Sequence, residues 1–104
     1  MAPVNPSDSQ LLEAVIVWTG WGTSIMPRRD DLLLVSHFGA ETASKLAPVI
    51  KALHDEFYSS EAWKIAADLP EMGRMAADDF KMKHPQIADQ IVQAFVWCYT
   101  YDYK

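Results

Sequence analysis

Apolar residues recur at helical spacing along most of the chain, with glycines and prolines between the repeats. The first repeat consists of Leu11, Leu12, Val15 and Ile16. It follows a capping box, Ser7-x-x-Gln10, which is a typical helix start. These features predict a first helix that ends near Trp18, before a glycine-rich loop over residues 19–27.

The longest stripe predicts a helix in the middle of the chain, and its members are Leu46, Ile50, Leu53 and Phe57. Pro48 leaves its start open, because proline is tolerated in the first turn of a helix and kinks the interior. Either the helix begins near Ala47, or an earlier turn from Thr42 is kinked at the proline. On the solvent side, Lys51 and Asp55 are spaced to form an ion pair.

Two shorter elements flank this stripe. Arg28 to Phe38 is predicted to form a short helix, because an apolar run follows two aspartates and glycine comes next. After the stripe, Ser59 or Ser60 can cap another short segment. We expect a break in the chain near Leu69.

The last third predicts two more helices. Asp68-Leu69-Pro70-Glu71 resembles a second capping signal, ahead of an apolar face of Met72, Met75, Ala76 and Phe80. His84-Pro85 restarts the chain as a final helix, whose stripe is Ile87, Ile91, Phe95 and Cys98. Since this helix is apolar on most sides, it must be central in the core or buried by a partner.

Alternation of apolar and polar residues, the pattern of a half-buried strand, is confined to the tail over residues 99–103, which is compatible with a frayed helix or an extended strand. The fold class predicted is all-α, an irregular bundle of five or six helices. A chain of 104 residues with no linker-like stretch fits one domain over residues 1–104.

Composition indicates a core that needs neither disulfide nor metal, since half of the residues are hydrophobic. Cys98 is the single cysteine, which fits a reducing compartment. The longest apolar run, residues 94–99, is far too short to cross a bilayer, and the first residues lack the pattern of a secretion signal. We therefore expect a cytoplasmic protein that does not bind membranes.

The formal net charge of −5 disfavours DNA and RNA as partners, because their phosphates repel an acidic protein. Residues 55–79 carry the whole excess of negative charge. Their seven acids and two bases are Asp55, Glu56, Glu61, Asp68, Glu71, Asp78, Asp79, Lys64 and Arg74. Such a segment predicts either a negative face that complements a basic protein, such as a toxin or enzyme, or an ordinary solvated face that maintains solubility.

Candidate chemistry is sparse. None of the three histidines lies in a ligand pattern, and no nucleotide, metal or nucleophile motif occurs. The sequence therefore predicts a protein that is not an enzyme and holds no metal or cofactor. The alternative is a small enzyme that uses His37, Glu41 or His54.

Two aromatic concentrations are candidate contact surfaces. The first, around the loop, contains Trp18, Trp21, Met26, Arg28 and Arg29, which are residue types common at protein interfaces. It is also compatible with a core plug and local ion pairs, with Trp18 expected in the core and Trp21 exposed. The second contains Trp97, Tyr99, Tyr101 and Tyr103 near the C-terminus, and packing against the first helix would explain it equally well.

The function expected is a small acidic protein-binding module, an inhibitor or immunity-type protein that neutralises another protein by direct binding. The predicted partner-binding residues are Trp21, Arg28, Arg29, Glu61, Asp68, Glu71, Asp78, Asp79, Tyr101 and Tyr103. The alternative is an accessory or oligomeric subunit, with a homo-oligomer as one version. In it Val92, Val96, Trp97 or Tyr101 lies in a contact between chains.

Overall fold

The computed structural model describes residues 8–103, and in this part of the chain every regular element is a helix. The helices are α1 (Asp8–Thr19), α2 (Asp31–Phe38), α3 (Ala40–Tyr58), α4 (Ala62–Ile65), α5 (Leu69–Lys83) and α6 (Asp89–Tyr103). The prediction of an all-α, irregular bundle is confirmed, and residues 99–103, which are compatible in sequence with a helix or a strand, are helical. None of the described helices is long and apolar enough to cross a membrane.

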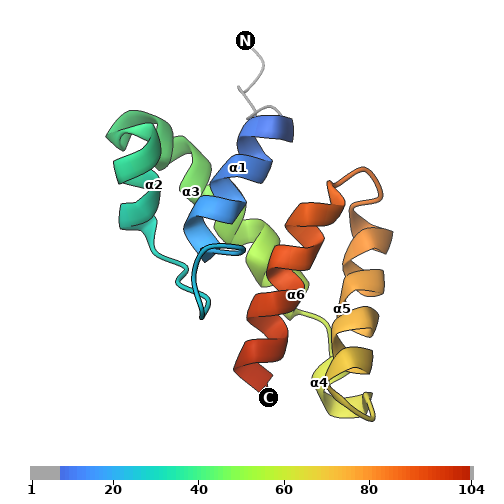
Figure 1. The fold of residues 1–104 in the computed structure, drawn as a ribbon. Coiled ribbons are helices and arrows are strands. Elements are labelled where there is room, and N and C mark those ends of the chain that lie inside the picture. The colour runs from blue at the N-terminus through green and yellow to red at the C-terminus, as the bar shows by residue number, and fades with distance from the viewer. Residues whose placement is uncertain (1–7, 104) are drawn as a thin grey trace.

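Helix α6 occupies the middle of the bundle (Figure 1). It packs against α1 and α3 on one side and against α5 on the other, and α5 and α6 run antiparallel. Ile91, Val92 and Phe95 are completely buried in these contacts. The final helix was expected to be either central in the core or buried by a partner, and its central position is the alternative that the fold adopts. Val92 is inaccessible to a second chain, so its proposed role in a contact between chains is wrong.

The core centres on Phe57 of α3. Its ring centroid lies 5.2 Å from that of Phe80, 5.8 Å from Phe95 and 5.6 Å from Tyr99. Burying one such ring stabilises the fold by about 1.5–3 kcal/mol. Trp18 is only 4% exposed, which confirms it as a core residue. Its indole nitrogen donates to Asp31 Oδ1 at 3.0 Å, so α1 is also linked to α2.

Some helix boundaries differ from the predictions. Helix α2 begins at Asp31 rather than Arg28, because the Asp30 side chain accepts the N–H of Leu32 and acts as the N-cap. Helix α6 begins at Asp89, after a turn over residues 84–88. Ser7, the first residue of the predicted capping box, lies outside the described residues.

Helix α3 begins at Ala40 and continues through Pro48, so the start near Ala47 is wrong, and the earlier alternative start at Thr42 lies two residues after the observed one. Pro48 is exposed, so it lies on the solvent side of the helix. Gly39, with a φ of 86°, ends α2 and begins α3 in a conformation that favours glycine. Lys51 pairs with Asp31 at 2.7 Å instead of with Asp55, which ties α3 to α2.

Candidate protein-binding surfaces

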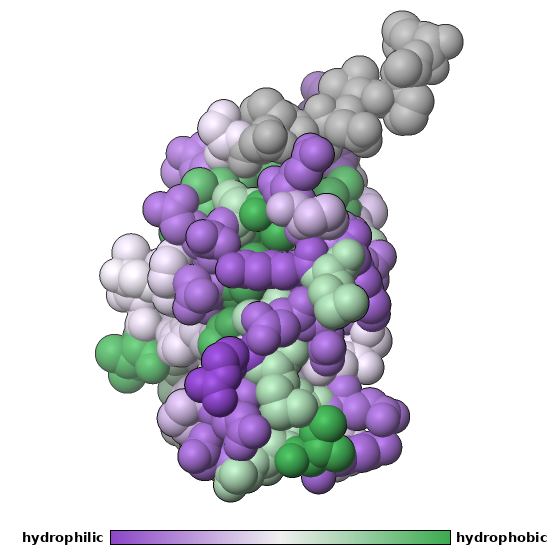
Figure 2. Space-filling view, turned by 90° about the vertical axis from the view of Figure 1, so that its right-hand side faces the viewer, coloured by the Kyte–Doolittle hydropathy of each residue, from purple (hydrophilic) through white to green (hydrophobic). Residues whose placement is uncertain are grey.

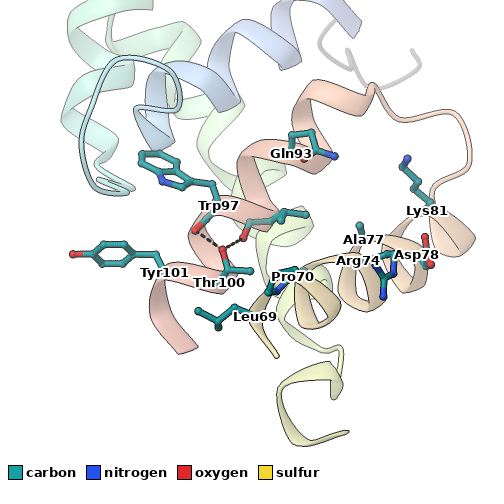
Figure 3. A pocket seen from close by; sticks show the side chains of 12 residues that line it. Leu69, Pro70, Arg74, Ala77, Asp78, Lys81, Gln93, Trp97, Thr100 and Tyr101 are labelled. Atoms are coloured by element: carbon teal, nitrogen blue, oxygen red, sulfur yellow. Dashed lines mark hydrogen bonds between the residues drawn. The ribbon is translucent and has the colours of Figure 1, made fainter. Parts of the chain in front are cut away.

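An open groove of about 670 Å³ runs between α5 and α6 (Figure 3). Gly73 of α5 lies at the floor of the groove, where it faces Val96 and Thr100 of α6. A Cβ at this position would lie 3.0 Å from Val96 Cγ1 and 3.1 Å from Thr100 Cγ2. The hydroxyl of Thr100 donates to the carbonyl of Val96 at 2.8 Å, which leaves its methyl group facing the glycine. The floor is therefore apolar.

Aromatic side chains of α6 and charged side chains of α5 border this groove. Trp97 and Tyr101 lie one turn apart on α6 and are half-buried, and Figure 3 shows them together on one side. On α5 the border carries Arg74, Asp78 and Lys81. Lys81 pairs with Asp89 at 3.0 Å, whereas Arg74 and Asp78 form no ion pair with any described residue.

The loop between α1 and α2 presents a second apolar feature. Ile25 is 93% exposed and Met26 is 48% exposed, and we call these two residues the loop tip. The turn before the tip is ordered by the N–H of Ser24, which donates to the carbonyl of Gly20 at 2.8 Å. The hydroxyl of Ser24 donates in turn to the carbonyl of Met26 at 2.7 Å. Gly20, at a φ of 80°, is required here because a Cβ would come within 2.9 Å of Ser24 Cβ.

The base of the loop is fastened to α6 by a charged network that we call the Arg29 clamp. Arg29 donates from both terminal nitrogens to the two carboxylate oxygens of Asp102, at 2.5 and 3.0 Å. Tyr58 completes the clamp, accepting from Arg29 at 3.0 Å and donating to Asp102 at 2.5 Å. Such bidentate, charge-assisted bonds are strong and set the orientation of both groups. Arg29 adopts a φ of 52°, unusual outside glycine, and the clamp holds it there.

The clamp also changes the acid–base properties of its members. The hydrogen bonds from Arg29 lower the pKa of Asp102 below its usual range, so the carboxylate stays ionised. Burial, followed by the hydrogen bond to Asp102, raises the pKa of Tyr58 and keeps its hydroxyl protonated as a donor. Burial raises the pKa of Cys98 to about 12, so its thiol is inert at neutral pH.

His54 lies behind the clamp in an aromatic environment. Its ring stacks on Tyr58 at 4.2 Å between centroids and contacts Trp18 and Phe95 edge-on. Its Nε2 atom is buried without a hydrogen-bond partner. Burial, and then the nearby charge of Arg29, lowers the pKa of His54, which keeps the ring neutral.

The predicted loop residues have different roles. Trp21 is half-buried and packs against the core, so the prediction that it is substantially exposed is wrong. Arg28 is exposed and forms no ion pair with a described residue. Arg29 reaches Asp102 of α6 rather than a neighbouring aspartate, so the expectation of a local ion pair is also wrong.

The predicted acidic residues are mostly engaged locally. Asp68 caps α5 by accepting the N–H of Glu71 at 2.8 Å, and Glu71 reaches back to the N–H of Ala67 at 2.9 Å. Asp79 accepts from the hydroxyl of Ser60 at 2.7 Å. The face of the molecule on which α5 lies is mainly hydrophilic, with separate apolar patches (Figure 2).

Basic groups interrupt this acidic region. Glu61 pairs with Lys64 at 3.5 Å. Arg74 lies within one turn of Glu71 and Asp78 on the same side of α5. Charges of both signs therefore alternate along the outer side of this helix.

Two of the C-terminal tyrosines, Tyr99 and Tyr103, pack against α3 and α4. Tyr99 is buried, and its hydroxyl donates to the carbonyl of Ser60 and accepts the N–H of Trp63. Tyr103 stacks on Trp63, with centroids 5.6 Å apart and planes inclined by 5°. Tyr101 alone among the C-terminal tyrosines borders the groove.

The histidine site expected for the enzyme alternative does not form. Glu41 and His54 are 13 positions apart on α3, about 20 Å along its axis. His37 pairs with Glu13 at 3.3 Å, and Glu41 with Lys45 at 3.9 Å. In the described part of the chain, no three His, Cys, Asp or Glu side chains gather in a way that could hold a metal ion.

Three features escaped the sequence analysis. The Arg29 clamp joins residues 73 positions apart, for which no local pattern exists. Gly73 was the available signal for the groove, since a glycine inside a helix costs about 1 kcal/mol and indicates close packing. The loop tip was also detectable, as two large apolar residues directly before a proline in a loop.

Comparison with models of protein families, with curated proteins and with solved structures gave no match for this chain.

Proposed function

We propose that this chain is a non-catalytic protein-binding module that acts by covering a surface of a partner protein. The loop tip is the observation that carries this proposal. Ile25 and Met26 present large apolar side chains to solvent, on a loop ordered by its own hydrogen bonds and by the Arg29 clamp. A pre-ordered apolar tip loses little conformational entropy when it enters a pocket, which favours binding.

The groove supports the same proposal. Trp97 lies on the side of α6 toward the α1–α2 loop (Figure 3), and the clamp joins that loop to α6. Trp97 and Tyr101 are half-buried aromatic residues of the types that dominate binding energy in protein interfaces. We propose that the loop tip and this aromatic border contact one partner together.

The more specific proposal is an inhibitor or immunity-type role against a basic protein. It is supported by the charge excess of residues 55–79, which gives the whole chain its net charge of −5. Opposite charge on a partner would accelerate association, and added salt would reduce that gain. Unlike Asp68 and Glu71, which cap α5, Asp55 and Glu61 are exposed acids of this segment whose side chains cap no helix.

Affinity capture from the native host, followed by mass spectrometry, tests the general proposal. The chain is immobilised as the wild type, as Ile25→Ser/Met26→Ser, and as the control Ile65→Ser, whose isoleucine is 70% exposed on α4. We expect one partner to be retained by the wild type and the control and lost by the double variant. Equal retention of every captured protein by all three chains contradicts the proposal.

Kinetics with the captured partner test the more specific proposal. Asp55→Lys/Glu61→Lys is expected to slow association at low salt, and the difference from the wild type should vanish at high salt. An association rate that matches the wild type at every salt concentration means that the acidic segment only maintains solubility.

A further inference from the structure

The outer side of α5 carries charges in an order that is antisymmetric about its midpoint. Glu71, Arg74, Asp78 and Lys81 follow one another at spacings of three, four and three residues, so they lie on one side of the helix. Their signs alternate, beginning negative and ending positive. Residue 76 is the midpoint of these four positions, and each of the two acids among them has a base at the same distance on the other side of it.

This order makes the side complementary to itself in an antiparallel arrangement. When two copies of α5 lie antiparallel about a two-fold axis at residue 76, each residue faces the one equally far from the midpoint on the other copy. Arg74 then faces Asp78 of the second copy, and Glu71 faces Lys81. The next facing pair outward is apolar, with Pro70 opposite Met82, a side chain that is 82% exposed.

The central charges are available for this pairing. Neither Arg74 nor Asp78 forms an ion pair with a described residue, although they stand four positions apart on one helix. A base that precedes an acid by four residues is the less favourable order for a pair within a helix. The central Arg74–Asp78 pairs between copies therefore replace no ion pair in the single chain, whereas Lys81, which would face Glu71, already pairs with Asp89.

We propose that this chain forms a two-fold symmetric homodimer through the outer side of α5, with two reciprocal Arg74–Asp78 ion pairs at its centre. One helix against one helix lies at the small end of specific interfaces, below about 1,200 Å² of buried surface, so the dimer is weak and forms at high protein concentration. Arg74 and Asp78 border the same groove as Trp97 and Tyr101, but the interface does not include the loop tip and does not depend on the proposed function.

Sedimentation equilibrium of the full chain, from micromolar to millimolar concentration, tests the proposal. The wild type is compared with variants in which the charge of Arg74 or Asp78 is reversed. The wild type is expected to dimerise, less strongly as salt rises. Arg74→Asp and Asp78→Arg should each weaken dimerisation by about tenfold or more, because like charges then meet at both central contacts. Arg28→Asp, which changes an exposed arginine in the α1–α2 loop, should leave dimerisation unchanged.

Two rescues make the test specific to the reciprocal geometry. The Arg74→Asp/Asp78→Arg double variant should dimerise like the wild type, because each central contact again joins opposite charges. An equimolar mixture of the two single variants should form a heterodimer, since one chain carries two acids and the other two bases at these positions. A wild type that stays monomeric throughout, or the failure of both rescues in variants with wild-type helical circular dichroism, overturns the proposal.

Discussion

The Arg29 clamp makes a stability prediction that can be worked out from its geometry. Replacing Arg29 with methionine keeps an apolar stem of similar length but removes three hydrogen bonds, two to Asp102 and one to Tyr58. Hydrogen bonds to charged groups contribute about 1.5–3 kcal/mol each when buried, whereas exposed ion pairs contribute at most about 1 kcal/mol. The side chains of Arg29 and Asp102 are 27% and 29% exposed, between these limits. We therefore expect a loss of about 2 kcal/mol.

Urea and thermal unfolding, followed by circular dichroism, measure this loss. For a domain of this size, 2 kcal/mol corresponds to a decrease in Tm of roughly 8–16 °C. Arg28→Met is the matched control, because the neighbouring arginine is exposed and forms no ion pair with a described residue, and it should change stability by less than about 0.5 kcal/mol. The double variant Arg29→Met/Asp102→Asn should lose less than the sum of the single variants. Equal stability of the two methionine variants would refute the assigned role of the clamp.

Three further predictions concern single side chains. The free energy of unfolding should decrease as pH falls below about 6.5, the pKa of histidine in the unfolded chain. The reason is that the fold lowers the pKa of His54, so the unfolded state binds more protons in this range. His54→Asn should therefore reduce the slope of the unfolding free energy between about pH 7.5 and 5. Gly73→Leu should cost about 1–3 kcal/mol, since its side chain would meet Val96 and Thr100, and near-wild-type unfolding would show that the floor of the groove is not tightly packed. Trp21→Ala should cost about 1–3 kcal/mol, because the indole packs against the core; unfolding unchanged from the wild type would show that it is a free contact residue.

Local signals in the sequence were sufficient for the helical framework. The stripe from Leu46 to Phe57, the stop at Gly39 and the cap at Asp68 each depend on residues within a few positions, and each occurs in the fold as predicted. The start of α3 was not predictable in this way. Tertiary packing of the stripe on both sides of Pro48 maintains the helix across a residue that disfavours it locally.

The candidate surfaces were less predictable, because they depend on contacts between distant segments. Trp21 lies between two glycines, a context that favours exposure, yet its indole reaches the core. Arg29 stands beside two aspartates but pairs with Asp102, because the fold brings the end of α6 to the base of the loop. Only the three-dimensional arrangement reveals which charged groups are engaged and which stay free.

The affinity of the captured partner for variants of the loop tip tests the central claim most directly. Titration calorimetry would compare Ile25→Ser with Ile65→Ser, the same substitution at two exposed isoleucines on different elements. A contact residue at the centre of an interface contributes about 2 kcal/mol, so Ile25→Ser should raise Kd by about thirtyfold while Ile65→Ser leaves it unchanged. Equal Kd values for the two variants would contradict the claim that the loop tip binds the partner.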